Sequence, residues 1–143
     1  MIGWLLDTNV VSELPKVRPE PRVARFVAAQ RLNLLYVSAV TLAEIRYGIE
    51  VLPDPARRAA LNSWLTHTIR PMFEDRILPI SEDVMVKWRM LVEEGRKSGH
   101  KYAQSDLIIA ATGLHHGLTV VTRNPDDYAA TRVELFNPWL DLG

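Results

Sequence analysis

The sequence contains no cysteine among its 143 residues. This absence excludes disulfides, thiolate nucleophiles and cysteine-based zinc sites together, so any metal ion must be bound by oxygen or by histidine. The chain also has no excess of charge of either sign, because 17 basic residues balance 17 acidic ones. Net charge therefore neither favours nor excludes nucleic acid as a partner, and only local clustering of charge could do so.

Long hydrophobic runs are also missing. No stretch approaches the roughly 20 apolar residues of a membrane-spanning helix, and the N-terminal MIGWLLDTNVV resembles no signal peptide. Hydrophobic residues nevertheless make up 48% of the chain, which suffices for the core of one globular domain. We therefore expect a single domain over residues 1–143, with no membrane association and a cytoplasmic location.

Short aliphatic runs alternate with helical periodicity along the chain. Strands are expected at 4–7, 34–37, 77–80, 118–121 and near 133–136. Helices are expected from Thr8 to before Pro15 and over about 21–30, 39–52 and 102–116, with apolar repeats of helical spacing also over 61–72 and 84–92. Strands that alternate with helices predict an α/β fold, in which helices cover both faces of a parallel sheet.

Three acidic residues lie where a soluble domain usually has apolar ones. They are Asp7 in WLLDTNVV, Glu44 in SAVTLAEIRYG and Asp106 in SDLIIAATG. A carboxylate among aliphatic residues must find a cation, gather hydrogen bonds or become neutral, because burying an unpaired charge costs several kcal/mol. Three such carboxylates that converge would favour a divalent ion, and hard oxygen ligands are typical of Mg²⁺ or Mn²⁺ sites.

Asp7 comes at the carboxyl end of the first expected strand, where open α/β sheets have their ligand sites. The alternative is that Asp7 only caps the helix that begins at Thr8. Asp106 precedes a run from Leu107 to Leu114 without any charged residue, and the helix positions on its own side are small or apolar. The alternative is a first-turn aspartate that the helix dipole favours, if the helix begins near Ser105.

Glu44 shares its side of the expected helix with apolar residues when the helix is projected at about 100° per residue. One apolar stripe holds Leu42, Ile45, Ile49 and Leu52, and a second holds Val40, Ala43, Tyr47 and Val51. Glu44 lies within the second stripe, so the pattern predicts a carboxylate among apolar neighbours. A solvated glutamate and a structural salt bridge to an arginine are the alternatives.

Three segments resemble a known family in type and in order. LLDTNVVSEL, SAVTLAEIRYG and DLIIAATGLHHGLTVVTRNPDDY resemble the PIN-domain family, and the ending VELFNPW resembles its VapC-type toxin branch, from type II toxin-antitoxin systems. The resemblance runs from about Trp4 to Trp139. It implies a PIN-like α/β/α sandwich with a five-stranded parallel sheet flanked by helices, and a metal-dependent endoribonuclease that uses Mg²⁺ or Mn²⁺.

The resemblance also implies site residues and partners. Asp7, Glu44 and Asp106 would be the catalytic acids and bind the metal, joined by a residue at the end of the fourth strand. RNA would be the substrate, and an antitoxin protein would bind and block the cleft. A homodimer is implied as well, with dimers that pair further in the complex with the antitoxin.

The fourth acidic position differs from the family pattern. TRNPDD has Asn124 where family members often carry an aspartate, and Asp127 follows three residues later. Asn124 could orient a metal-bound water or coordinate through its amide oxygen, whereas Asp127 could replace the missing acid or be an exposed loop residue. A pair of ions suits in-line phosphodiester cleavage, but the sequence is compatible with either one bound ion or two. Thr122 could support a carboxylate or a water through its hydroxyl, and Ser12 is a weaker candidate for such support.

Basic residues near the acids are candidates to contact RNA phosphates. Arg123 adjoins Asn124, and a cluster precedes the helix of Asp106. This cluster comprises Arg96, Lys97, His100 and Lys101. Ordinary solvated charge is the alternative interpretation of all these side chains.

Two other function classes remain open. A phosphatase-like phosphoester hydrolase of the haloacid-dehalogenase kind also has an aspartate after its first strand. Its nucleophile is normally followed two positions later by a second aspartate, whereas this chain has Asn9 there. A non-catalytic binding module on the same fold would have to account for acids among apolar residues on three separate elements.

Overall fold

A five-stranded parallel sheet forms the centre of the computed structural model, which describes residues 3–140. The strands are β1 (Trp4–Leu6), β2 (Leu35–Ser38), β3 (Ile77–Leu78), β4 (Thr119–Val121) and β5 (Leu135–Phe136). Their order in the sheet is β3-β2-β1-β4-β5. The central strand β1 therefore lies between β2 and β4, with Trp4 opposite both Leu35 and Thr119.

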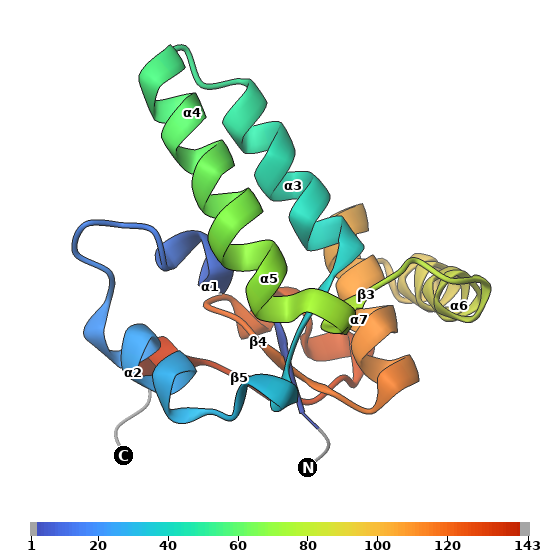
Figure 1. Cartoon of the computed structure of the whole chain (residues 1–143). Helices are drawn as coiled ribbons and strands as arrows, with labels where there is room; N and C mark the ends of the chain where they lie inside the picture. Colours follow the sequence, from blue (N-terminus) through green and yellow to red (C-terminus); the bar gives the residue numbers. More distant parts are fainter. Residues whose placement is uncertain (1–2, 141–143) are drawn as a thin grey trace.

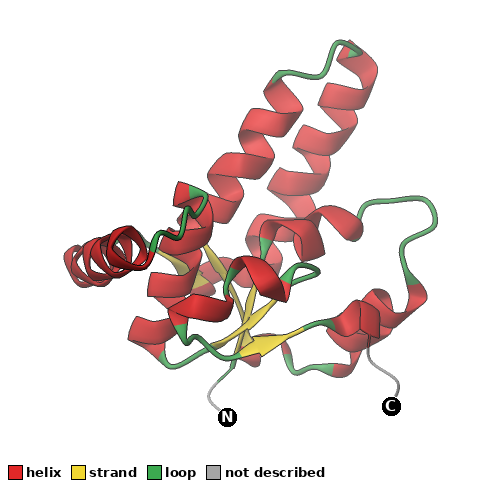
Figure 2. Ribbon diagram, turned by 180° about the vertical axis from the view of Figure 1, so that it is seen from behind, coloured by secondary structure: helices red, strands yellow, loops and turns green. Residues whose placement is uncertain are grey.

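Helices connect the strands and cover the sheet on both sides (Figures 1 and 2). They are α1 (Thr8–Glu13), α2 (Pro21–Ala29), α3 (Ala39–Glu50), α4 (Pro55–Trp64), α5 (Arg70–Phe73), α6 (Glu82–Ser98) and α7 (Gln104–His116). A π-helical segment, Leu65–Ile69, joins α4 to α5. The predicted fold class, a parallel sheet of five strands flanked by helices, is confirmed within the described residues.

Two hydrophobic clusters lie on opposite faces of the sheet, because successive strand side chains point to opposite sides. Leu6 and Val121 belong to one cluster, with residues of α1, α2, α3 and α5. Leu5 and Val120 belong to the other, with residues of α6 and α7. Both strands are thus buried on both faces, as their continuous aliphatic sequences lead one to expect.

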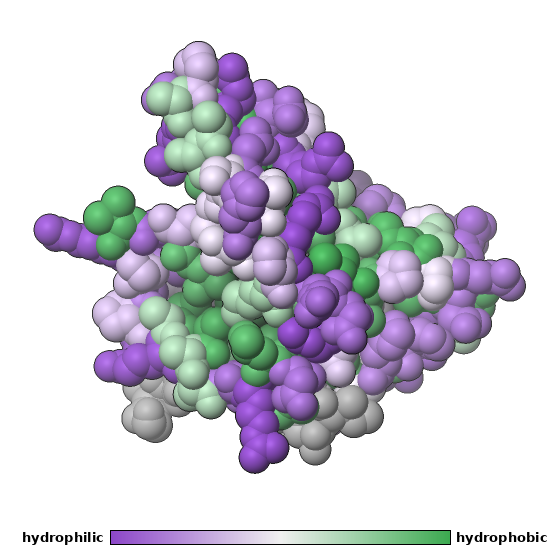
Figure 3. Space-filling view, in the orientation of Figure 1, coloured by the Kyte–Doolittle hydropathy of each residue, from purple (hydrophilic) through white to green (hydrophobic). Residues whose placement is uncertain are grey.

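The α3–α4 pair projects away from the sheet as a helical hairpin (Figure 1). Hydrophobic side chains gather at the base of this hairpin in the space-filling view of the same side (Figure 3). One of the two apolar stripes of α3 is buried, through Leu42, Ile45 and Ile49. Most of the second stripe is not, since Tyr47 is 69% and Val51 58% exposed, and only Val40 packs against the core.

The ends of the elements differ from the prediction by a few residues. β3 has two residues instead of the four of ILPI, and α7 begins at Gln104 rather than near residue 102. Gly117 is the C-cap of α7 and has a φ of 68°, which glycine adopts without steric cost. No helix in the described range is long and apolar enough to cross a membrane.

Candidate active site

The candidate site lies at the carboxyl edge of the sheet, around the end of β1. Asp7 directly follows β1, and Thr122 directly follows the neighbouring strand β4. Glu44 comes from the helix that follows β2, on the other side of β1, and Asp106 comes from the first turn of α7. In a parallel sheet the segments after neighbouring strands meet at one edge, and this topology brings the acids of three elements together.

Asp7 is buried, with 5% of its surface exposed, and its two carboxylate oxygens accept different hydrogen bonds. Oδ1 accepts from the backbone N–H of Thr8 at 2.7 Å, so Asp7 is also the N-cap of α1. Oδ2 accepts from the hydroxyls of Thr122 at 2.7 Å and Tyr128 at 2.9 Å. Capping alone does not explain Asp7, because its second oxygen is held by residues from the far end of the chain.

Asp106 lies near Asp7 through a shared partner. The hydroxyl of Tyr128, which contacts Asp7, is also 3.3 Å from Oδ1 of Asp106. Asp106 also lies in the first turn of α7, where the helix dipole favours an aspartate. The contact with Tyr128 exists in addition to this first-turn position. Both the helix dipole and the Tyr128 hydroxyl therefore act on the same carboxylate.

The electrostatics of the site reflect crowded negative charge. Burial and the nearby charges of Asp7 and Asp127 raise the pKa of Asp106 to about 6. Burial raises the pKa of Asp7 as well, against the opposing effect of its hydrogen bonds from Thr122 and Thr8, and the charge of Glu44 adds to the rise. Burial and the charges of Asp7 and Asp106 raise the pKa of the Tyr128 phenol, which is thus a neutral donor at physiological pH.

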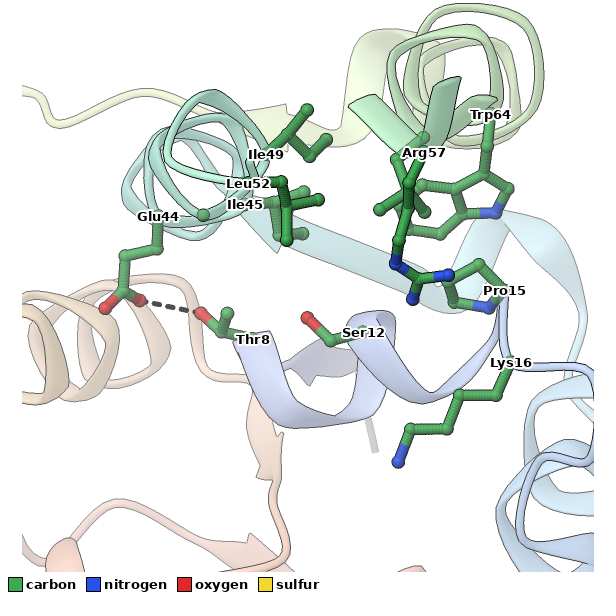
Figure 4. A pocket seen from close by; sticks show the side chains of 12 residues that line it. Thr8, Ser12, Pro15, Lys16, Glu44, Ile45, Ile49, Leu52, Arg57 and Trp64 are labelled. Atoms are coloured by element: carbon green, nitrogen blue, oxygen red, sulfur yellow. Dashed lines mark hydrogen bonds between the residues drawn. The ribbon is translucent and has the colours of Figure 1, made fainter. Parts of the chain in front are cut away.

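The prediction that Glu44 lies among apolar neighbours is wrong, because its side chain is exposed. The reason is the projection of the α3–α4 hairpin, which leaves the second stripe of α3 beyond Val40 in solvent. Glu44 is nonetheless directed toward the site, since its Oε1 accepts a 2.7 Å hydrogen bond from the hydroxyl of Thr8, the residue after Asp7 (Figure 4).

Asn124 and Asp127 are both exposed in the loop after β4. The backbone N–H of Asn124 donates to the Thr122 hydroxyl at 3.1 Å, which helps to orient the group that contacts Asp7. The charge of Asp127 acts on Asp106 and raises its pKa. Of the two candidates for the fourth position, Asp127 is thus the one whose charge adds to the acidic cluster.

A groove of about 310 Å³ runs beside the acids, between α1, α3 and α4 (Figure 4). Its lining includes Thr8, Ser12, Lys16, Glu44, Arg57 and Trp64. Ser12 is exposed to this groove, one turn of α1 beyond Thr8. The groove combines acidic, basic and aromatic side chains next to the site.

The other basic candidates lie around the site rather than in it. The Arg123 guanidinium is 5.4 Å from the ring of Trp139, and the Arg123 backbone N–H donates to Asn9 Oδ1 at 3.2 Å. Arg96 pairs with Glu93 at 2.7 Å. A second hollow, near the start of α7, is lined in part by Arg96, His100 and Lys101.

The carboxylate oxygens of Asp7, Glu44 and Asp106 are suitable ligands for a divalent cation, although they form no complete ligand set by themselves. In the part of the chain that the structure describes, no ion pair involves Asp7, Glu44 or Asp106, so their charges have no basic partner there. Residues 3–140 contain no group of three histidine or acidic side chains already arranged to bind an ion. Mg²⁺ commonly binds through one or two carboxylates and keeps several waters, which matches an open, oxygen-only site of this kind.

Three contacting residues are absent from the sequence-based set. Thr8 contacts Glu44, Asn9 Nδ2 lies 3.3 Å from the Thr122 hydroxyl, and Tyr128 contacts two acids. Thr8 and Asn9 stand within the quoted motif LLDTNVVSEL, so their position next to Asp7 was a usable signal. Tyr128 is the last residue of the quoted motif DLIIAATGLHHGLTVVTRNPDDY, so its place in that motif was a usable signal, although its irregular segment has no periodicity.

The chain belongs to the PIN domain family, whose model matches residues 4–133. It is 38% identical to Toxin FitB of Neisseria gonorrhoeae over 137 residues, which covers 96% of this chain and 99% of the relative. It is 36% identical to VapC ribonuclease Y4jK of Sinorhizobium fredii over 135 residues, covering 94% and 96% of the two chains. The crystal structure of FitAcB from Neisseria gonorrhoeae superposes with a TM-score of 0.91 at 37% identity, covering 96% of this chain and 99% of that one.

Proposed function

We propose that this protein is a metal-dependent endoribonuclease and the toxin of a type II toxin-antitoxin pair. The observation that carries the proposal lies at the carboxyl end of β1, where the Tyr128 hydroxyl contacts both Asp7 and Asp106 and the Thr8 hydroxyl contacts Glu44. None of these three acids has a basic partner in residues 3–140. Relatives named as a ribonuclease and as a toxin, each similar along nearly its whole length, support the same reading. We propose a cytoplasmic location as well, since the proposed RNA substrate is made there.

Asp7 and Asp106 would provide the carboxylates nearest to the ion, which we propose to be Mg²⁺ or Mn²⁺. A divalent ion bound there would supply charge stabilisation and activation of water for in-line phosphodiester cleavage. Glu44 would complete the site from the solvent side, directly or through water, because its carboxylate is exposed and already contacts Thr8. Thr122 keeps Asp7 in position through its hydroxyl.

We propose Asp127 as the source of the fourth negative charge, and an uncharged supporting role for Asn124. The effect of Asp127 on the pKa of Asp106 supports this assignment. Asp127 is exposed, and Asn124 has no charge to hold a second ion tightly. A second ion would therefore bind only when substrate phosphate supplies further oxygens.

The groove beside Glu44 is the proposed approach for the RNA backbone. Lys16 and Arg57 line it and offer positive charge within the same cavity as Glu44 and Thr8 (Figure 4). A cognate antitoxin would block the cleft, for example by presenting a basic side chain to the carboxylates. The proposal also includes a homodimer, with dimers that pair further when the antitoxin binds.

Hydrolysis of small phosphoesters is less well supported by the contacts of Asn9. A haloacid-dehalogenase site needs an acid at that position, whereas Asn9 Nδ2 lies 3.4 Å from Asp7 Oδ2 and 3.3 Å from the Thr122 hydroxyl. The test is a comparison of structured RNAs and a chromogenic phosphate monoester as substrates of the purified protein with Mg²⁺. Cleavage of RNA alone supports the proposal, turnover of the monoester alone supports the phosphatase, and turnover of neither supports a binding module.

A further inference from the structure

Tyr128 combines a buried ring with a hydroxyl that lies between two acids. It is 1% exposed, and its ring belongs to the hydrophobic cluster of α6 and α7. The hydroxyl lies 2.9 Å from Asp7 Oδ2 and 3.3 Å from Asp106 Oδ1. One rigid side chain thus connects the hydrophobic core to both carboxylates.

The backbone of Tyr128 is fixed on both sides, so the position of the phenol is set by the fold. Its N–H donates to the carbonyl of Pro125 at 3.0 Å. Its own carbonyl accepts from the hydroxyl of Thr131 at 2.6 Å and from the N–H of Thr131 at 2.9 Å. A tyrosine has only two side-chain torsions, and packing of the ring restricts both.

A phenylalanine would fill the core equally well, so the hydroxyl needs its own explanation. Burial of a hydroxyl costs free energy unless it forms hydrogen bonds, and here the partners that satisfy it are the two carboxylates. A neutral donor also lets two acids lie close together without adding charge. The hydroxyl has a single proton, which the two carboxylates must share. It can therefore contact both of them only while both point toward the phenol oxygen.

We propose that Tyr128 is a positioning residue, whose hydroxyl holds the carboxylates of Asp7 and Asp106 toward one point and so prepares them to bind a divalent ion. This inference rests on the proposed function, because it assumes that the two acids bind metal. It assigns no contact with RNA or with the reacting atoms to Tyr128. Removal of the hydroxyl should weaken binding of the ion even when no RNA is present.

The test is calorimetric titration of Mn²⁺ alone into the wild-type protein, Tyr128→Phe and the matched control Tyr36→Phe. Tyr36 packs against the same hydrophobic cluster from β2, so its variant removes a phenol oxygen elsewhere on that core. We expect Tyr128→Phe to bind Mn²⁺ about 10- to 100-fold more weakly, as is typical when a residue that orients a metal ligand is lost, and Tyr36→Phe to bind like wild type. Thermal unfolding of the metal-free proteins controls for folding.

The possible results separate the two proposals. Equal or tighter binding by Tyr128→Phe, with wild-type binding present, overturns the positioning role and leaves the metal site in place. A wild-type protein that binds no Mn²⁺ overturns the metal site, and this inference with it.

A second measurement does not depend on how well Tyr128→Phe folds. The chain has 4 tyrosines, so 3-fluorotyrosine labelling of the wild-type protein gives few ¹⁹F signals, and variants at the other three positions identify that of Tyr128. We expect the Tyr128 signal to shift on Mg²⁺ addition, because the partners of its hydroxyl change when they bind the ion. A Tyr128 signal that stays in place at saturating Mg²⁺ contradicts the proposal.

Discussion

The hydroxyl of Thr122 donates a 2.7 Å hydrogen bond to the buried carboxylate of Asp7, across 115 residues of sequence. The two residues follow neighbouring strands, β1 and β4, whose pairing aligns Leu6 with Val121. The register of the central sheet therefore determines where the Asp7 carboxylate points. The geometry of the candidate site thus follows from strand pairing, which places the Thr122 hydroxyl next to Oδ2 of Asp7.

Thr122→Val should reduce cleavage, because the isosteric side chain cannot donate to Asp7. We expect kcat/KM for RNA to fall about 10- to 100-fold, and Thr122→Ser to retain most of the activity because it keeps the hydroxyl. Steady-state cleavage of one RNA substrate with Mg²⁺ measures both variants. Equal activity of the valine and serine variants would show that this hydrogen bond has no role in the reaction.

Asp7→Asn should separate stability from activity. The amide can still cap α1 through its oxygen, and it removes a buried negative charge that lies near Asp106 and Glu44. We expect the metal-free variant to unfold at the same temperature as wild type or higher, with RNA cleavage reduced at least about 100-fold. A strong decrease in thermal stability would mean that Asp7 is chiefly structural.

The stability of the metal-free protein should depend on the ionisation of Asp106. The pKa of Asp106 is raised to about 6 in the folded protein, above the value of about 3.9 for an unfolded chain. Between these values the folded state binds more protons, so the contribution of Asp106 to the free energy of unfolding decreases as pH rises from about 4 to about 6.

This prediction is measured as a difference between two proteins, because other carboxylates titrate in the same range. Urea unfolding with a chelator is compared for wild type and Asp106→Asn at several pH values. We expect the stability of wild type relative to the variant to fall as pH rises through about 6, and Mg²⁺ to restore it above that pH. A relative stability that rises with pH would contradict a raised pKa.

Asp127→Asn and Asn124→Ala distinguish the two candidates for the fourth position. Since the charge of Asp127 raises the pKa of Asp106, its removal should lower that pKa in the metal-free protein. We expect Asp127→Asn to reduce cleavage about 10-fold and Asn124→Ala to have a smaller effect. Carboxyl ¹³C titration by NMR gives the pKa, and cleavage under the conditions used for Thr122 gives the activity. A larger loss of cleavage in Asn124→Ala than in Asp127→Asn would show that Asn124 is the functional residue at the fourth position.

Much of the fold is predictable from the sequence, because aliphatic runs and helical spacing report which faces are buried. Leu5 and Leu6 already indicate a strand covered on both sides, and Gly117 marks the end of its helix. The strand lengths are less predictable. Pairing with a neighbour decides where a strand ends, and β3 pairs through only Ile77 and Leu78.

The candidate site is predictable where a residue directly follows a buried strand, as Asp7 and Thr122 do. The surroundings of Glu44 are not, because helical projection identifies two apolar stripes but not which of them meets another element. Tyr128 has no periodic signal, and only the folded chain brings its hydroxyl to Asp7 and Asp106.

The most direct test of the central claim is cleavage of a panel of structured RNAs by the purified protein with Mg²⁺ or Mn²⁺. Asp106→Asn and a chelator are run beside the wild type. We expect wild type to cleave a subset of the RNAs at defined positions, and both the variant and the chelator to abolish these cuts. The same cuts in Asp106→Asn, or in the presence of the chelator, would contradict a metal-dependent ribonuclease built on these acids.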